Sequence, residues 1–181
     1  MLFKETTLNG AFVVEIEPQQ DERGFFARTF CEREFAEHGL PTRFPQCNLS
    51  RNARVGTLRG MHFQAAPLWE AKLVRCVSGA IWDVIIDLRP GSATRFASVG
   101  VELSAQNACA LFVPEGFAHG FVTLQDNTDV FYQMSEVFRP EGARGLRWND
   151  PRFDIHWPTP PRVISRRDAT YPDFDPAKFD G

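Results

Sequence analysis

The sequence predicts an all-β protein, a sandwich or barrel of short strands that forms one domain over residues 1–181. Three observations support this class. Helical periodicity is scarce, apolar and polar residues alternate in many short segments, and turn residues recur between these segments at intervals of about 8 to 12 residues. A chain of 181 residues can also bury most of its apolar surface without disulfides or a structural metal.

One short helix is expected over Glu32–His38, because Gly39 can cap its C-terminus and Pro41 follows shortly after. The expected strands cover residues 11–16, 24–30, 47–51, 56–63, 71–88, 97–103, 110–113, 120–124 and 128–135. Ser78-Gly79 divides the longest of these segments into two strands, which we expect to pair as a hairpin.

After Ser135 the chain contains several Pro and Gly residues, and we expect an extended, irregular tail there. The tail nevertheless carries Trp148, Phe153 and Trp157, large aromatic side chains that must pack against the rest of the protein. We therefore expect the tail to fold onto the sandwich, where it can complete a site at one end.

The composition gives no support for a nucleic acid partner or a membrane surface, since 20 basic and 23 acidic residues are spread without a run of like charge. No segment approaches the roughly 20 apolar residues of a transmembrane helix, and no targeting segment is visible. We expect a soluble, cytoplasmic protein. The four cysteines, Cys31, Cys47, Cys76 and Cys109, lie too far apart for a zinc motif or a disulfide framework.

The segment Thr57–Gln64 contains the first candidate for chemistry. If it is a regular strand, Leu58, Gly60, His62 and Gln64 share one face, and Gly60 leaves open space for a ligand beside the imidazole. The alternative is a core histidine that is hydrogen-bonded to a carbonyl group.

Two further polar side chains fall on apolar strand faces. The chain has 17 Phe but only two Tyr, so the hydroxyl of Tyr132, which shares a face with Val130 and Met134, is expected to have a role. Lys72 shares its face with Val74 and Cys76. The alternatives are a buried tyrosine bonded to a carbonyl and a lysine that extends to water from a strand end.

The segment Pro114-Glu115-Gly116-Phe117-Ala118-His119 resembles the second motif of the cupins, small β-barrels with a site at the barrel mouth. The first cupin motif supplies His-x-His and a Glu as metal ligands, but here Gln64 replaces the second histidine. Only His62, His119 and Glu70 remain as ligands for zinc or iron. We expect the barrel without the metal, and a metal-dependent cupin stays as an alternative.

Nine motifs in order resemble the dTDP-4-dehydrorhamnose 3,5-epimerase family, and the resemblance runs from about residue 3 to residue 173. They lie at Asp21–Phe26, Gln46–Ser50, Leu58–Gln64, Lys72–Gly79, Asp83–Arg89, Pro114–Phe121, Tyr132, Trp148–Pro151 and Ser165–Asp168. The resemblance implies a cupin-type double-stranded β-helix, or jelly roll, that is usually a homodimer and uses neither metal nor other cofactor. It also implies inversion of carbons beside the C4 ketone of a nucleotide-linked 4-keto-6-deoxyhexose, in the supply of deoxysugars for polysaccharides.

By the same resemblance, His62 is the base that removes the proton at C3 and C5, and Tyr132 is the acid on the opposite face. Lys72 lies near the enolate oxygen, and Asp168 bonds the far nitrogen of His62. His119 and Asp83 form a second pair behind the site. The implied substrate-binding residues are Arg23, Phe26, Gln46, Asn48, Arg59, His119, Phe138 and Arg167.

Two departures from the family pattern concern the nucleotide. Arg28 stands where many members carry Glu, and Phe138 stands where they carry an aromatic hydroxyl for stacking on the base. The favoured reaction converts dTDP-4-dehydro-6-deoxyglucose to dTDP-4-dehydro-L-rhamnose. A CDP- or other NDP-sugar, inversion at C3 or C5 alone, a metal-dependent cupin oxygenase or isomerase, and a non-catalytic sugar-nucleotide-binding cupin stay open as alternatives.

Overall fold

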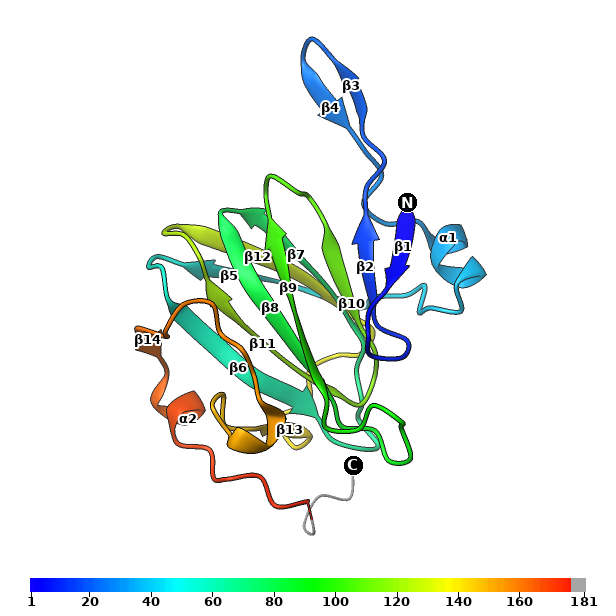
Figure 1. Cartoon of the computed structure of the whole chain (residues 1–181). Coiled ribbons are helices and arrows are strands. Elements are labelled where there is room, and N and C mark those ends of the chain that lie inside the picture. Colours follow the sequence, from blue (N-terminus) through cyan, green and yellow to red (C-terminus); the bar gives the residue numbers. More distant parts are fainter. Residues whose placement is uncertain (177–181) are drawn as a thin grey trace.

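In the computed structural model, which describes residues 1–176, two antiparallel sheets face each other as a sandwich (Figure 1). The first sheet has the strand order β1 (Leu2–Glu5), β2 (Phe12–Glu15), β10 (Ala110–Val113), β7 (Lys72–Ser78), β12 (Thr128–Met134) and β5 (Gln46–Asn52). The second has the order β13 (Ala143–Gly145), β6 (Thr57–Gln64), β11 (Phe117–Thr123), β8 (Ala80–Asp87) and β9 (Ser98–Ser104), and β14 (Val163–Ile164) pairs in parallel with β6. The predicted all-β jelly roll is confirmed.

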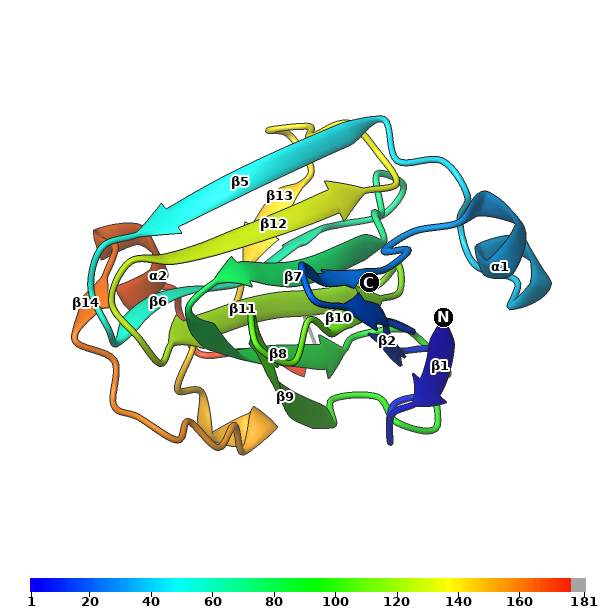
Figure 2. The same cartoon turned by 90° about the horizontal axis from the view of Figure 1, so that it is seen from above.

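A separate hairpin, β3 (Gln19–Asp21) and β4 (Gly24–Phe26), projects away from the sandwich (Figure 1). The helical elements are α1 (Glu32–Glu37), a 3-10 turn (Pro151–Phe153) and α2 (Arg166–Ala169). The tail elements β14 and α2 lie at the opposite end of the sandwich from β1 and α1 (Figure 2). Neither described α-helix is long and apolar enough to cross a membrane.

Most predicted elements form within one or two residues of their expected bounds. The helix ends at Glu37 and is followed by Gly39 at a φ of +69°, as its sequence indicates. The strand expected over residues 24–30 ends at Phe26. The sequence did not indicate β1, β3, β13, β14 and α2, which are all at most four residues long and carry little periodicity.

The hairpin predicted at Ser78-Gly79 is wrong, because β7 belongs to the first sheet and β8 to the second. The chain crosses between the sheets at Gly79, whose φ is +76° and whose missing side chain makes room for Thr128. A tight turn between two apolar strands has the same sequence pattern in a hairpin and in a sheet-to-sheet corner. Burial on both faces of β8 removes the alternation that could distinguish them.

Three apolar clusters hold these layers together. The cluster between the sheets includes Val74 and Cys76 from β7 and Ile81 and Ile85 from β8. A second cluster lies where the tail covers the outer face of the second sheet, and its members include Met61, Phe63, Val84, Ile86 and Leu146 with Phe153 and Trp157 of the tail. The third gathers around Phe35 of α1 on the outer face of the first sheet. The prediction that the tail packs on the sandwich is confirmed.

Strands β6 and β11 approach closely where two glycines face each other. A Cβ atom added to Gly60 would lie 2.5 Å from the Cα atom of Gly120, and Gly60 has a φ of +139°. The space beside His62 that the sequence suggested for a ligand is therefore occupied by the neighbouring strand. The prediction of an open space at Gly60 is wrong.

The variant Gly60→Ala should lower the free energy of unfolding by more than about 2 kcal/mol, because the methyl group overlaps the β11 backbone at an unfavourable φ. Urea denaturation measures this loss. Gly91→Ala is the matched control, since Gly91 also has a positive φ, of +75°, but open space around its Cα, and it should cost about 1 kcal/mol. Equal losses in the two variants would contradict the close contact.

Candidate active site

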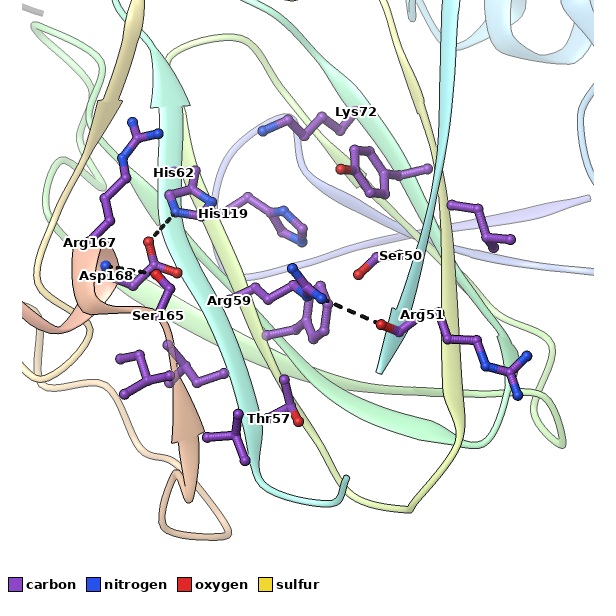
Figure 3. Close-up of a pocket in the computed structure, with 16 residues that line it drawn as sticks. Ser50, Arg51, Thr57, Arg59, His62, Lys72, His119, Ser165, Arg167 and Asp168 are labelled. Carbon is purple, nitrogen blue, oxygen red and sulfur yellow. Dashed lines mark hydrogen bonds and ion pairs between the residues drawn. The ribbon is translucent and has the colours of Figure 1, made fainter. Parts of the chain in front are cut away.

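One groove opens between the two sheets at the end formed by β5 and β6. It consists of two adjoining cavities of about 710 Å³ and 420 Å³. Both are lined by Leu49, His62, Lys72, Tyr132 and Arg167, so these side chains lie where the cavities meet. Figure 3 shows the larger cavity, with Arg59 of the second sheet directed toward Ser50 and toward the backbone oxygen of Arg51 in the first, while the Arg51 side chain points away.

His62 and Asp168 form the hydrogen bond that the family resemblance implies. Nε2 of His62 lies 2.7 Å from Oδ1 of Asp168, and the His62 side chain is 41% exposed toward the groove (Figure 3). Asp168 reaches this position from α2, where Ser165 Oγ accepts a hydrogen bond from the Asp168 N–H. With Nε2–H directed at the carboxylate, Nδ1 of a neutral imidazole keeps its lone pair.

Asp168 is buried yet remains ionised. Burial alone would raise the pKa of its carboxyl group, but hydrogen bonds from the His62 ring, the Gly60 N–H and Ser165 outweigh this effect. The pKa therefore lies below its ordinary value. An ionised carboxylate on Nε2 favours a ring that accepts a proton, because it stabilises the imidazolium form.

Tyr132 stands on the opposite wall of the groove from His62. It lies on β12 of the first sheet with Val130 in the core and Met134 in the cavity lining, on the predicted face. Burial raises the pKa of its hydroxyl, Arg59 counteracts this, and Glu70 adds to it. The phenol therefore keeps its proton at neutral pH and can act as a donor.

Lys72 does not extend to water from its strand end, since it is only 7% exposed. Its Nζ lies 2.9 Å from Oε1 of Glu70, and Gln64 Nε2 donates to Oε2 of the same carboxylate at 2.8 Å. Glu70 is thus engaged by a lysine and an amide. Residues 1–176 contain no group of three or more His, Cys, Asp or Glu side chains that could hold a metal, so the ligand set of the metal-dependent alternative is not assembled.

Arg59 also faces the groove, although regular alternation would place it opposite to His62. The pairing of β6 with β11 changes register between the His62–His119 and Arg59–Phe121 pairs, so residues three positions apart reach the same side. Arg59 Nε donates to Asn52 Oδ1 at 2.8 Å, which fixes the guanidinium against β5. The prediction of regular alternation fails at this irregularity.

The second predicted pair is also present. Nε2 of His119 lies 2.7 Å from Oδ1 of Asp83, and both residues are buried behind the groove. His119 also lines the larger cavity.

The smaller cavity contains Gln46, Asn48 and Phe138, as expected for substrate-binding residues. Gln46 Oε1 accepts a hydrogen bond from the Phe138 N–H at 2.9 Å, and Gln46 Nε2 donates to Asn48 Oδ1 at 3.3 Å. The Phe138 side chain remains largely exposed beside the opening. Arg144 lines the same cavity and was not indicated by its sequence context.

Arg23 and Phe26 do not reach the groove of their own chain. Both belong to the projecting hairpin β3–β4, where Phe26 is 76% exposed and Arg23 is bonded to Asp21 (Figure 1). Arg28 pairs with Glu34 at 2.6 Å beside a separate cavity at the base of this hairpin. The sequence motif carries no information about this separation, and the role of Arg23 and Phe26 in substrate binding stays a prediction.

Residues 5–176 match the family model described as dTDP-4-dehydrorhamnose 3,5-epimerase. The chain belongs to this family. A dTDP-4-dehydrorhamnose 3,5-epimerase of Methanothermobacter thermautotrophicus is 44% identical over 172 residues, which cover 93% of this chain and 92% of that relative.

Solved structures of epimerases share the whole fold. The dTDP-4-dehydrorhamnose 3,5-epimerase of Elizabethkingia anophelis superposes with a TM-score of 0.93 at 37% identity, covering 96% of each chain. The dTDP-6-deoxy-D-glucose-3,5-epimerase of Legionella pneumophila, in complex with dTDP-4-keto-L-rhamnose, gives a TM-score of 0.87 at 36% identity, over 93% of this chain and 89% of that one. The sandwich is therefore the cupin-type fold of this epimerase family.

Tyr171 adjoins this epimerase groove and was missed by sequence reasoning. Its hydroxyl accepts a hydrogen bond from Arg167 Nε at 2.7 Å, and its ring meets the His62 ring edge-on at 6.5 Å between centroids. The signal was available, because the scarcity of tyrosine that singled out Tyr132 applies equally to Tyr171.

Replacing Asp168 by Asn should destabilise the fold at neutral pH but not in acid. A carboxyl group with a lowered pKa stabilises the folded state fully above about pH 4, and this contribution disappears as the pH falls through the folded-state value. Urea denaturation of wild type and Asp168→Asn from pH 7 to pH 3 measures the difference. The exposed Asp154→Asn serves as the control for loss of charge, and a pH-independent difference for Asp168→Asn would contradict the assignment.

Proposed function

We propose that this protein converts dTDP-4-dehydro-6-deoxyglucose to dTDP-4-dehydro-L-rhamnose by epimerisation at C3 and C5. One observation carries the proposal: a histidine backed by a carboxylate and a protonated tyrosine stand on opposite walls of one groove, with a buried lysine at the same junction. Inversion at a carbon needs this arrangement, because the proton must leave on one face and return on the other. The family to which the chain belongs supports the choice of substrate.

In this mechanism His62 Nδ1 takes the proton from a carbon beside the C4 ketone, and the electron pair of the broken C–H bond moves into an enolate. The ammonium of the buried Lys72 stabilises the negative charge on the enolate oxygen, an interaction that is stronger where the charged groups are shielded from water. Tyr132 then gives its proton to the carbon from the opposite face, which completes the inversion, and the phenolate regains a proton from solvent before the next step. Asp168 stabilises the imidazolium until His62 releases its proton to solvent.

We assign the nucleotide diphosphate to the groove around this junction. Arg59 and Arg167 supply cationic N–H groups, and Gln46 and Asn48 supply amide groups, all of which suit phosphate oxygens. Phe138, with its ring largely exposed at the rim, is suited to stack on the nucleobase.

Exchange in heavy water tests the base. Wild-type protein incubated with dTDP-4-keto-6-deoxyglucose should incorporate deuterium at C3 and C5, and His62→Ala should lose this by at least about a thousandfold, because general-base catalysis is removed. NMR or mass spectrometry reads the label. His156→Ala, at an exposed histidine outside both cavities, is the control. Retained exchange in His62→Ala would overturn the assignment, and the CDP-linked sugar run in parallel identifies the nucleotide that is used.

We further propose that two copies of the chain associate as a homodimer in which the hairpin β3–β4 of one copy reaches the groove of the other. The hairpin exposes Phe25, Phe26 and Arg23, although large apolar side chains are usually covered in a stable assembly. Leu49 is 64% exposed at the groove rim, and its strand β5 forms an edge of the first sheet. The exposed hairpin of one copy and the groove rim of the other therefore suit each other as an interface.

A complementation experiment tests this exchange of hairpins. The variant Arg23→Ala/Phe26→Ala should lose activity although neither residue lines the groove of its own chain. Co-expression of this variant with His62→Ala should restore activity to roughly one quarter of wild type, because half of the dimers are mixed and each mixed dimer has one intact site. A monomer in light scattering, or no restoration on co-expression, would contradict the proposal.

A further inference from the structure

The Tyr171 side chain forms a hydrogen bond with Arg167, a nearby residue in the sequence. Its hydroxyl oxygen accepts the Arg167 Nε–H at 2.7 Å, and the guanidinium carbon lies 5.9 Å from the ring centroid. Both residues belong to the turn around α2 that also presents Asp168 to His62. Tyr171 lies two residues beyond the end of α2, so the bond ties the helix to the segment that follows it.

The Tyr171 ring is held in a fixed position. A side chain added to Gly145 of β13 would overlap the ring, so glycine at this position lets the ring lie directly on the backbone. The ring also meets the His62 ring edge-on, with a 70° angle between the ring planes. A tyrosine held between a backbone and an imidazole has little freedom to move its hydroxyl.

Arg167 lies at the junction of the two cavities and lines both of them (Figure 3). Its Nε is used by Tyr171, and within residues 1–176 no other hydrogen bond or ion pair engages the guanidinium. The two Nη groups of the planar Arg167 guanidinium are therefore available to bind a ligand. Such a pair of donors matches two oxygens of a phosphate group.

We propose that Tyr171 is a positioning residue, which locks the Arg167 guanidinium so that its two Nη groups hold the diphosphate of the nucleotide sugar. An exposed arginine loses much rotational freedom when it binds a ligand, and a fixed Nε–H removes part of that loss before the ligand arrives. This inference rests on the proposed function for the identity of the ligand. Because the His62–Asp168 bond does not involve the Tyr171 hydroxyl, the hydroxyl acts on binding and not on proton transfer.

A double-mutant cycle tests the inference with dTDP as the probe. Tyr171→Phe removes only the hydroxyl and should raise the dissociation constant for dTDP by roughly five- to tenfold, within the range of the net contribution of one intramolecular hydrogen bond. The KM should rise similarly, while kcat stays within about twofold. In an Arg167→Ala background the same Tyr171→Phe change should have no further effect, because its partner is gone.

Calorimetry measures the dissociation constants, and thermal unfolding of each variant verifies the fold. Arg166→Ala, whose side chain lines neither cavity, is the matched control and should bind dTDP as wild type does. An unchanged dissociation constant in Tyr171→Phe, or an equal loss with and without Arg167, would overturn the inference. Failure of the proposed function has a different signature, namely no deuterium incorporation by the wild-type protein whatever its affinity for dTDP.

Discussion

The hydrogen bond between His62 and Asp168 is the contact on which the candidate site depends. It joins residues 106 positions apart and links the second sheet to the tail. The tail reaches His62 because β14 pairs with β6 and because Phe153 and Trp157 pack in a shared apolar cluster on the outer face of that sheet. Packing energy from apolar burial therefore fixes the position of an ionised group that could not hold a 2.7 Å contact through its charge alone.

The two-layer architecture also explains how several polar groups remain buried near the groove. Lys72 forms an ion pair with Glu70, and His119 is bonded to Asp83. Each potential charge therefore has a partner within hydrogen-bond distance. Among residues 1–176 Tyr132 has no such partner, and burial raises the pKa of its hydroxyl further above neutral pH. The facing sheets thus place a proton acceptor and a proton donor on opposite walls of one groove.

The sequence supports a prediction wherever the backbone is regular. Period-two alternation placed Lys72 and Tyr132 correctly on the inner face, because β7 and β12 are ordinary strands there. The same rule failed at Arg59, where the register of β6 shifts, and at Gly60, whose missing side chain accommodates a strand and not a ligand. Arg23 shows the limit of a sequence motif. The motif identifies a residue by its type and its position in the sequence, but it does not say how far that residue lies from the groove.

The order in which the groove acquires its parts follows from the place of α2 in the chain. All strands of both sheets except β14 are complete at Gly145, yet Arg167 and Asp168 come some twenty positions later. A polypeptide released before Ser165 would contain nearly the whole sandwich and lack both of these groups. During synthesis, the His62 imidazole therefore gains its carboxylate partner only after α2 has been made.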